Sequence, residues 1–259
     1  MQIQGSAALV TGAGSGLGAA TARELARRGA AVALLDIDDR ATQEVADGIV
    51  KLGGRAVALS CDITSGESVQ AAIDAAAASH GPARVLLNIA GIGTAKRIVG
   101  KDGLPAPLAE FERVVRVNLI GTYNVARLFA AVAVKLDPLE DGERGVIVNT
   151  ASVAAFDGQV GQEAYAASKG GVVSMTLPLA RDLAQWGVRA VTIAPGLFRT
   201  PLMDELPQQV QESLAASIPF PRRLGKPSEF AALAVAIIEN PALNGEVIRL
   251  DGALRMAPR

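Results

Sequence analysis

The sequence lacks the side chains from which disulfides and common zinc sites are built. Its 259 residues include one cysteine, Cys61, and one histidine, His80. An intramolecular disulfide is therefore impossible, and a reducing cytoplasm is the expected compartment. A zinc site of Cys and His ligands is disfavoured, and we expect no metal. His80 falls where a predicted helix ends, which favours capping or a dipole interaction over a Ser-His-Asp triad.

Aromatic residues, an excess of charge and long hydrophobic runs are also scarce. Aromatic side chains make up 3% of a chain that is 50% hydrophobic, as expected for aliphatic strands covered by helices on both faces. A formal net charge of −1 gives no overall attraction for nucleic acid or an anionic membrane. The most apolar run, 128–134, is too short to span a bilayer, and the N-terminus has no basic segment typical of a targeting peptide. We therefore expect a cytoplasmic protein without nucleic-acid or membrane partners.

The sequence does contain a repeated alternation of strand-like and helical segments. The strand-like segments are 7–11, 31–35, 55–60, 84–87, 145–150, 188–194 and 246–250. This alternation predicts an α/β fold, a single Rossmann-like doubly wound parallel sheet of about seven strands with helices on both faces. We expect residues 1–259 to form one domain that binds ligands at the carboxyl ends of its strands.

Four of the helical segments bear on the predicted site. Long helices are expected over 108–136 and 162–186, and a shorter one over 228–239 that Ser228 caps. The region 202–223 lies between prolines and resembles one short amphipathic helix. We expect the surrounding segment, 197–223, to act as a substrate lid.

A glycine-rich turn follows the first strand-like segment. Gly12, Gly16 and Gly18 form the pattern G-x-x-x-G-x-G and lead into a helical segment. Glycine lets the backbone approach a pyrophosphate closely, and the start of a helix presents free N–H groups to anions. A tight turn also uses glycine, so the strand before and the helix after are what favour a dinucleotide site.

Asp36 ends the second strand-like segment, about twenty residues beyond the glycine turn, where a dinucleotide fold places the residue that faces the adenosine ribose. A carboxylate accepts hydrogen bonds from both ribose hydroxyls. A 2′-phosphate at about 4 Å would instead be repelled by about 4 kcal/mol at an effective dielectric constant of about 20. Asp36 therefore predicts NAD rather than NADP. Its alternative role is to cap the helix that begins near Asp39.

Tyr165 and Lys169 stand four residues apart on a predicted helix, and Ser152 precedes them. This spacing places the phenol and the ammonium on one helix face, one turn apart. Bringing a tyrosine pKa from about 10 to about 7 takes roughly 4 kcal/mol. One nearby cation lowers a pKa by about 1 to 3 units, so a second positive group, such as an oxidised nicotinamide ring, is expected. A tyrosine and a lysine four residues apart are also common on helix surfaces without any catalytic role. Other motifs must therefore decide whether this pair is catalytic.

Taken together, these motifs resemble the short-chain dehydrogenase/reductase family over nearly the whole chain. The matching residues are Gly12-x-x-x-Gly16-x-Gly18, Asn88-x-Ala90-Gly91, Asn118, Ser152, Tyr165-x-x-x-Lys169 and Pro195-Gly196-x-x-x-Thr200. Three longer stretches, 151–162, 193–198 and 240–256, most resemble the type II 3-hydroxyacyl-CoA dehydrogenases, also described as 17β-hydroxysteroid dehydrogenases type 10. The chain departs from the family pattern at Ile89, where the family has Asn or Cys, and at 166–167.

The resemblance implies a role for each matched residue. Tyr165 is expected to exchange a proton with the substrate hydroxyl while C4 of NAD exchanges hydride with the carbon. Lys169 is expected to lower the pKa of Tyr165 and to hold the nicotinamide ribose. Ser152 would orient the substrate oxygen, and Asn118 would support a water relay near Lys169.

The implied binding residues fall into a cofactor set and a substrate set. The cofactor set is Gly12, Ser15, Gly16, Leu17 and Gly18 around the cofactor, Asp36 at the adenine ribose, Asp62 at the adenine, Ala90 and Gly91 at the middle, Thr200 at the carboxamide, and Tyr165 with Lys169. The substrate set is Ser152, Phe156, Gln159, Gln162, Tyr165 and Leu197.

The resemblance and Asp36 favour NAD-dependent oxidation of a 3-hydroxyacyl-CoA to the 3-oxoacyl-CoA, a reaction of fatty acid metabolism. A 3-oxoacyl-carrier-protein reductase, for which NADPH is expected, and a dehydrogenase of hydroxysteroids or other secondary alcohols are alternatives. A dinucleotide sensor or RNA-associated scaffold is the non-enzymatic alternative, disfavoured by the complete catalytic set and the slightly acidic charge. Lys96, Arg97 and Lys101 are either contacts for CoA phosphates or part of a solvated loop. Family members are usually homo-oligomers, so a tetramer or dimer is expected.

Overall fold

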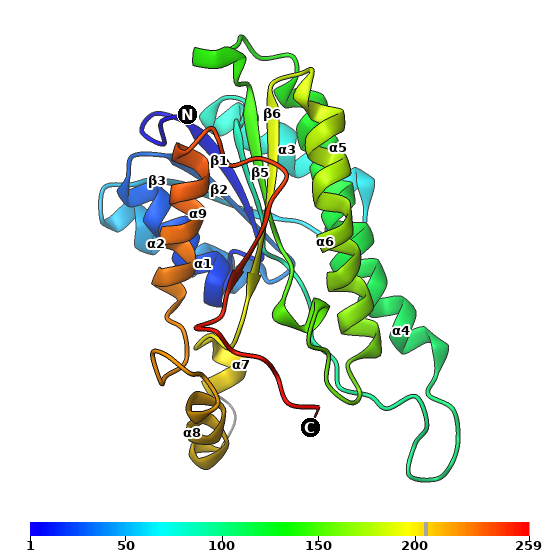
Figure 1. The fold of residues 1–259 in the computed structure, drawn as a ribbon. Helices are drawn as coiled ribbons and strands as arrows, with labels where there is room; N and C mark the ends of the chain where they lie inside the picture. The colour runs from blue at the N-terminus through cyan, green and yellow to red at the C-terminus, as the bar shows by residue number, and fades with distance from the viewer. Residues whose placement is uncertain (205–206, 259) are drawn as a thin grey trace.

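A computed structural model describes residues 1–204 and 207–258, and these form one parallel sheet of seven strands (Figure 1). The strands are β1 (Ala7–Thr11), β2 (Ala31–Asp36), β3 (Arg55–Ser60), β4 (Val85–Asn88), β5 (Gly145–Thr150), β6 (Val188–Pro195) and β7 (Val247–Leu250). Their order is β3-β2-β1-β4-β5-β6-β7, and each neighbouring pair is parallel. The prediction of a Rossmann-like parallel sheet of about seven strands is confirmed.

Helices cover both faces of the sheet (Figure 1). On one face lie α1 (Gly16–Arg27), α2 (Asp39–Lys51) and α9 (Pro227–Glu239). On the other lie α3 (Gly66–His80), α4 (Leu108–Val115), α5 (Thr122–Ala133) and α6 (Glu163–Ala184). Successive residues of a strand enter opposite layers, because side chains alternate along a strand. In β5, Val146 and Val148 pack in the first layer and Ile147 packs in the second.

Two of the predicted helices differ from the observed ones for local reasons. The helix expected over 108–136 contains a π-helical turn, Arg116–Gly121, between α4 and α5. The helix α9 begins at Pro227 with Lys226 as its N-cap residue, so the prediction that Ser228 caps it is wrong. Proline is favoured at the first helical position because its missing N–H has no partner to lose there.

The predicted lid contains two short helices. These are α7 (Pro201–Asp204) and α8 (Gln208–Ala216), in place of the single helix expected over 202–223. Part of that prediction, at 205–206, lies outside the described residues. Within the described ranges, we find no helix of the length and apolarity that a bilayer crossing requires.

A buried ion pair joins β6 to the segment before β5. The Arg189 Nε lies 2.7 Å from the Glu143 carboxylate, and both side chains are 8% exposed. The same guanidinium donates to the carbonyl oxygens of Ile237, Ile238 and Leu243, so it ties α9 and the following turn to β6. The charge of Arg189 is therefore shielded from water and depends on Glu143 for compensation.

We predict that Glu143→Gln lowers the free energy of unfolding by about 3 kcal/mol, because it leaves the buried Arg189 cation uncompensated. Urea unfolding of the variant and the parent protein measures this change. Glu44→Gln is the matched control, since Glu44 pairs with Arg40 at an exposed site where the loss is below about 1 kcal/mol. Equal effects of the two substitutions would contradict the prediction.

Candidate active site

The predicted site residues gather at the carboxyl ends of the strands. Two adjoining cavities lie there, one of about 530 Å³ beside the glycine turn and one of about 280 Å³ beside Ser152, Tyr165 and Lys169. They share Leu17, Gly91 and Thr200 in their walls. The boundary between β1 and β4, where the strand order reverses, opens into the first cavity, as the rule for open α/β sheets predicts.

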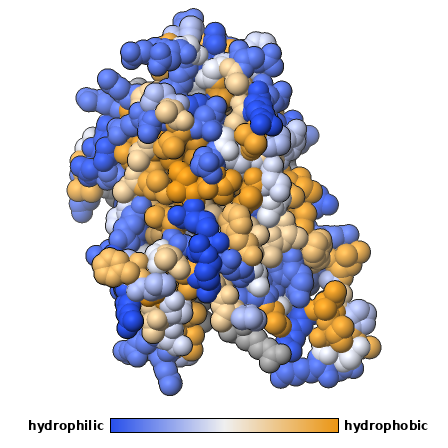
Figure 2. Space-filling model, viewed as in Figure 1, coloured by the Kyte–Doolittle hydropathy of each residue, from blue (hydrophilic) through white to orange (hydrophobic). Residues whose placement is uncertain are grey.

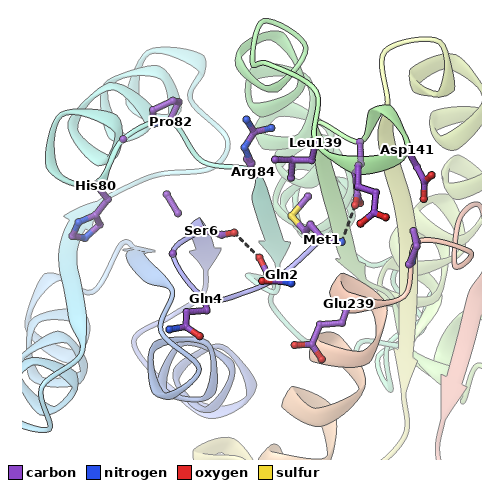
Figure 3. Close-up of a pocket in the computed structure, with 16 residues that line it drawn as sticks. Met1, Gln2, Gln4, Ser6, His80, Pro82, Arg84, Leu139, Asp141 and Glu239 are labelled. Carbon is purple, nitrogen blue, oxygen red and sulfur yellow. Dashed lines mark hydrogen bonds and ion pairs between the residues drawn. The ribbon is translucent and has the colours of Figure 1, made fainter.

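A further cavity of about 840 Å³ lies at the opposite end of the sheet (Figure 3). Figure 3 shows it between the N-terminal segment, Arg84 and Leu139, with His80 at its margin. The Ser6 hydroxyl there donates to the carbonyl oxygen of Gln2 at 2.7 Å. None of the predicted catalytic or cofactor residues lines this cavity, so its size does not make it the candidate site.

The glycine turn packs tightly between β1 and α1. Gly12 has a φ of 66°, and a Cβ atom there would lie 2.8 Å from the Ala90 Cα. A Cβ atom at Gly18 would overlap the carbonyl oxygen of Gly12. Ser15 is the N-cap residue of α1, and its side chain makes no capping hydrogen bond. The first turn of α1 therefore presents backbone N–H groups to the cavity without side chains in the way, which suits a pyrophosphate.

Asp36 ties the end of β2 to the glycine turn. Its carboxylate accepts hydrogen bonds from the backbone N–H of Gly14 at 3.0 Å and of Asp38 at 3.2 Å. The capping role considered for Asp36 belongs to Asp38, whose side chain accepts from the Ala41 N–H at the start of α2. Asp36 lines the larger cavity, so its negative charge faces the space where a ribose would lie.

Asp62 and Thr200 lie at two other parts of the cavity walls. Asp62 is exposed, and its carboxylate accepts from the N–H and the hydroxyl of Thr64. Thr200 lines both cavities, and its methyl group is the nearest neighbour of a Cβ atom built at Gly16. Ala90 and Gly91 complete the wall of the larger cavity after β4.

Thr11 is a site residue that the sequence analysis missed. Its buried hydroxyl accepts hydrogen bonds from the backbone N–H of Ile89 at 3.0 Å and of Ala90 at 3.1 Å. It thereby holds the segment after β4 against the end of β1. A hydroxyl at the last position of an apolar strand was the available sequence signal.

Ser152, Tyr165 and Lys169 come together between the end of β5 and α6. Lys169 is 3% exposed as a residue, and its ammonium donates to the Thr150 carbonyl oxygen at 2.8 Å and lies 5.9 Å from the centre of the Tyr165 ring. The Ser152 hydroxyl and the Tyr165 phenol line the same cavity, and the Ser152 hydroxyl accepts from the Ala154 N–H at 3.1 Å. The spacing of four on α6 thus places the amine beneath the phenol.

Burial moves the pKa values of the two α6 residues in opposite directions. Desolvation raises the pKa of Tyr165, and the hydrogen bond with Ser152 opposes this rise. Desolvation also lowers the pKa of Lys169 to about 8. The protein's own groups thus leave the phenol a weaker acid than free tyrosine. The second positive group that the sequence analysis expected beside Tyr165 is still required to lower its pKa.

Asn118 lies in the π-helical turn, directly behind Gly91. Its side-chain oxygen accepts from the Ile92 N–H at 2.8 Å, and its amide nitrogen donates to the Ile92 carbonyl oxygen and to the Ser168 hydroxyl. Ser168, which the sequence analysis did not select, donates to the Tyr165 carbonyl oxygen at 2.8 Å. Asn118 therefore connects the segment after β4 to α6. Single π-helical turns are frequent at functional sites.

The predicted substrate residues are divided by the structure. Ser152, Tyr165 and Leu197 line the smaller cavity, together with Phe198 and Met203. Three others lie in or beside the loop before α6 and outside that lining, namely Phe156, Gln159 and Gln162. Phe156 is 49% exposed, and the Gln162 side chain accepts from the Gln159 N–H.

The smaller cavity also contains polar groups suited to a ribose. Among the described residues, the Thr150 hydroxyl is buried and has no hydrogen-bond partner. An ammonium has three donors, and the hydrogen bond from Lys169 to Thr150 uses one of them. Ribose hydroxyls both donate and accept, so the residues present fit a dinucleotide. In the part of the chain that the structure covers, no cluster of three or more His, Cys, Asp or Glu side chains would hold a metal ion.

We predict that the stability of the ligand-free protein rises relative to Lys169→Met between about pH 8 and about pH 10.5. In this range the folded protein releases a proton that the unfolded chain still binds, so deprotonation favours folding. The full gain is about 3 kcal/mol. Urea unfolding at pH 7.5 and pH 10 measures most of this gain, with Lys51→Met at an exposed position as control. A pH-independent difference between the parent protein and Lys169→Met would rule out a depressed lysine pKa.

Comparisons with known proteins agree with this geometry. The family model described as short chain dehydrogenase matches residues 6–211. The chain is 52% identical over 257 residues to the 3-hydroxyacyl-CoA dehydrogenases type-2 of Rattus norvegicus and Homo sapiens, covering 99% of this chain and 97% of each relative. The crystal structure of 3-hydroxyacyl-CoA dehydrogenase type-2 from Mycobacterium avium matches with a TM-score of 0.94 and 45% identity over 98% of both chains. A 7α-hydroxysteroid dehydrogenase complexed with NADH and 7-oxo glycochenodeoxycholic acid matches with a TM-score of 0.89 and 30% identity, covering 100% of this chain and 97% of that one. The chain belongs to the short-chain dehydrogenase family.

Proposed function

We propose that this protein catalyses the NAD-dependent oxidation of 3-hydroxyacyl-CoA to 3-oxoacyl-CoA and the reverse reduction. The observation that carries the proposal is the single cavity that Ser152, Tyr165 and Lys169 line together, with the buried Lys169 ammonium bonded to the Thr150 carbonyl oxygen. The substrate class is supported by the relatives named 3-hydroxyacyl-CoA dehydrogenase type-2, which are 52% identical over 99% of the chain.

The proposed chemistry moves one proton and one hydride. Ser152 holds the oxygen on C3 of the substrate, and Tyr165 takes the proton of that hydroxyl as a carbonyl forms. Lys169 keeps positive charge beneath the phenol, and we propose that Asn118 supports the water relay through which the proton leaves. NAD, when bound, supplies the acceptor for the hydride that leaves C3. In the reduction, Tyr165 returns the proton to the developing alkoxide.

We propose that NAD lies along the two adjoining cavities. Asp36 would accept from the ribose hydroxyls and repel a 2′-phosphate, and Lys169 would hold the nicotinamide ribose. The other proposed cofactor contacts are Gly12, Ser15, Gly16, Leu17, Gly18, Asp62, Ala90, Gly91, Tyr165 and Thr200. The NADH in the 7α-hydroxysteroid dehydrogenase complex supports this cofactor.

Two other substrate classes have weaker support. The 3-oxoacyl-[acyl-carrier-protein] reductase FabG of Thermotoga maritima is 34% identical over 98% of the chain, and the 7α-hydroxysteroid dehydrogenase is 30% identical. Both identities are well below the 52% shared with the acyl-CoA dehydrogenases. The apolar wall of Leu197, Phe198 and Met203 is compatible with a steroid as well as an acyl chain.

We further propose a role in fatty acid metabolism in the cytoplasm, with residues 1–259 acting as one domain and 197–223 as its substrate lid. A homo-oligomer, either a tetramer or a dimer, is supported by exposed apolar side chains on two opposite faces of the molecule. The edge strand β7 is half-buried, and Figure 2 shows apolar side chains gathered on the face that carries α9. On the side of the opposite helices, Phe111 in α4, Tyr123 in α5 and Trp186 in the turn after α6 are more than two-fifths exposed. Such surfaces mark interaction sites.

We predict that Tyr165→Phe lowers kcat for the reduction of acetoacetyl-CoA with NADH by at least about 100-fold, because the phenol is the proton donor. Steady-state assays measure the loss, and NADH binding followed by its fluorescence should weaken far less than kcat falls, because most of the proposed cofactor contacts lie on other residues. Unchanged turnover by Tyr165→Phe would refute the mechanism. No turnover of acetoacetyl-CoA by the parent protein, beside robust turnover of another ketone, would refute the substrate class.

We also predict that Asp36→Ala lowers kcat/KM for NAD by about 10- to 100-fold, the value of charged hydrogen bonds to the ribose, while turnover with NADP rises. Assays with both cofactors at fixed substrate test this. Asp39→Asn is the matched control, because it removes a neighbouring charge from the exposed start of α2. If the two variants alter the cofactor ratio equally, the effect is one of overall charge and Asp36 has no selective role.

A further inference from the structure

The loop 156–162, which connects the serine and tyrosine of the proposed site, is held by a residue far along the chain. Arg249, on the edge strand β7, forms a two-pronged ion pair with Asp157. Its two terminal nitrogens lie 2.6 Å and 3.3 Å from the two carboxylate oxygens. Such a fork fixes the orientation of both groups as well as their distance. The side chains are 21% and 18% exposed, so the pair is largely shielded from water.

The same guanidinium is anchored on its other side. Its Nε donates to Asp251 at 2.8 Å, one terminal nitrogen also donates to the Leu254 carbonyl oxygen at 3.0 Å, and the group lies 5.2 Å from the centre of the Phe156 ring. The pairing lowers the pKa of the Asp157 carboxyl and raises that of Arg249. Arg249 is therefore a rigid link between β7, the chain that follows it, and the loop.

The C-terminal segment 251–258 lies along the same loop. The Val160 N–H donates to the Pro258 carbonyl oxygen at 3.1 Å, and the Gln159 side chain donates to the Ala257 carbonyl oxygen at 2.9 Å. Figure 1 shows this red segment passing between α7 and the green chain that leads into α6. At its start, a Cβ atom built on Gly252 would lie 2.7 Å from the Ile218 side chain, so the segment also touches the chain that follows α8.

The loop has a third attachment, to the irregular segment 92–107. The Lys96 N–H donates to the Gly161 carbonyl oxygen at 2.7 Å. This segment carries the cations considered above for CoA phosphates, so the loop lies between it and the C-terminal segment. Ser152 and Tyr165 themselves are fixed by β5 and α6. Loss of the Arg249 contacts would therefore move the loop and leave the reacting groups in place.

We infer that Arg249 is a positioning residue for the substrate. Through Asp157 it clamps the loop 156–162, whose Gly161 lines a separate cavity of about 250 Å³ together with Lys96 of the segment 92–107, and the acyl-CoA would reach this cavity with the part of it that lies away from the reacting carbon. The inference rests on the proposed function for the identity of the substrate. The clamp itself rests on the ion pair, the Phe156 contact and the C-terminal hydrogen bonds.

Hydrogen exchange by mass spectrometry tests the clamp without any substrate. In Arg249→Met the amides of 156–162 should exchange about tenfold faster or more, because a charged hydrogen-bonded fork is lost. Arg249→Lys should fall between this variant and the parent protein, since it keeps the charge without the fork. Asp157→Asn removes the loop carboxylate that pairs with Arg249 without altering β7, and it decides the question if Arg249→Met does not fold.

Arg255→Met is the matched control. Arg255 also pairs with Asp251 and bonds the Leu254 carbonyl oxygen, and it makes neither the Asp157 fork nor the Phe156 contact. Its loop amides should exchange at the parent rate. Equal acceleration by Arg255→Met and Arg249→Met, or no acceleration in Arg249→Met and Asp157→Asn, would overturn the clamp.

Kinetics test the consequence for the substrate. In Arg249→Met and Asp157→Asn, KM for acetoacetyl-CoA should rise about tenfold. By contrast, kcat, KM for NADH and KM for ethyl acetoacetate, which has no CoA moiety, should change less than about twofold. A uniform rise in all KM values would overturn the positioning role. If the parent protein reduces other ketones and not acetoacetyl-CoA, the proposed function fails, and the exchange rates alone then support or overturn the clamp.

Discussion

The burial of the Lys169 ammonium is the constraint on which the rest of the site depends. The group is almost fully removed from water, and burial alone accounts for its lowered pKa. Three segments meet around it, since Thr150 supplies its carbonyl acceptor and a Cβ atom at Gly91 would lie 3.3 Å from its nitrogen. An apolar side chain would cost less at this position. A lysine here is consistent with its proposed role beside the Tyr165 phenol, whose ring centre lies 5.9 Å from the ammonium.

The fold was predictable from the sequence because its signals are local. Apolar strands alternate with helices, and the glycine turn marks the first connection. Features that depend on distant neighbours were not predictable. Thr11 bonds to residues 78 and 79 positions away, and Asn118 bonds to Ser168 across 50 positions. The π-helical turn at Asn118 likewise forms where α4 and the turn itself pack against α6, which a continuous helical pattern does not reveal.

For a similar reason, the structure brings some of the predicted site residues together and places others outside the reacting cavity. Ser152, Tyr165 and Lys169 meet because one strand end and one helix turn are enough to bring them together. Gln159 and Phe156 were expected at the substrate from their position between the serine and the tyrosine. Their observed partners, Ala257 and Arg249, lie more than ninety residues along the chain. Proximity in sequence to a catalytic residue therefore located the loop without showing which way its side chains face.

The strand order has a consequence for how the molecule responds to its cofactor. β1 and β4 are neighbours in the sheet, and each is the first strand of one half of the chain, β1–β3 or β4–β7. The groove between them is therefore built from both halves. Neither half of the chain contains a complete groove. A ligand that binds across this boundary gains its full binding energy only when both halves are folded and docked. Its binding is therefore linked to the cooperative unfolding of the whole sheet, and the halves gain stability together.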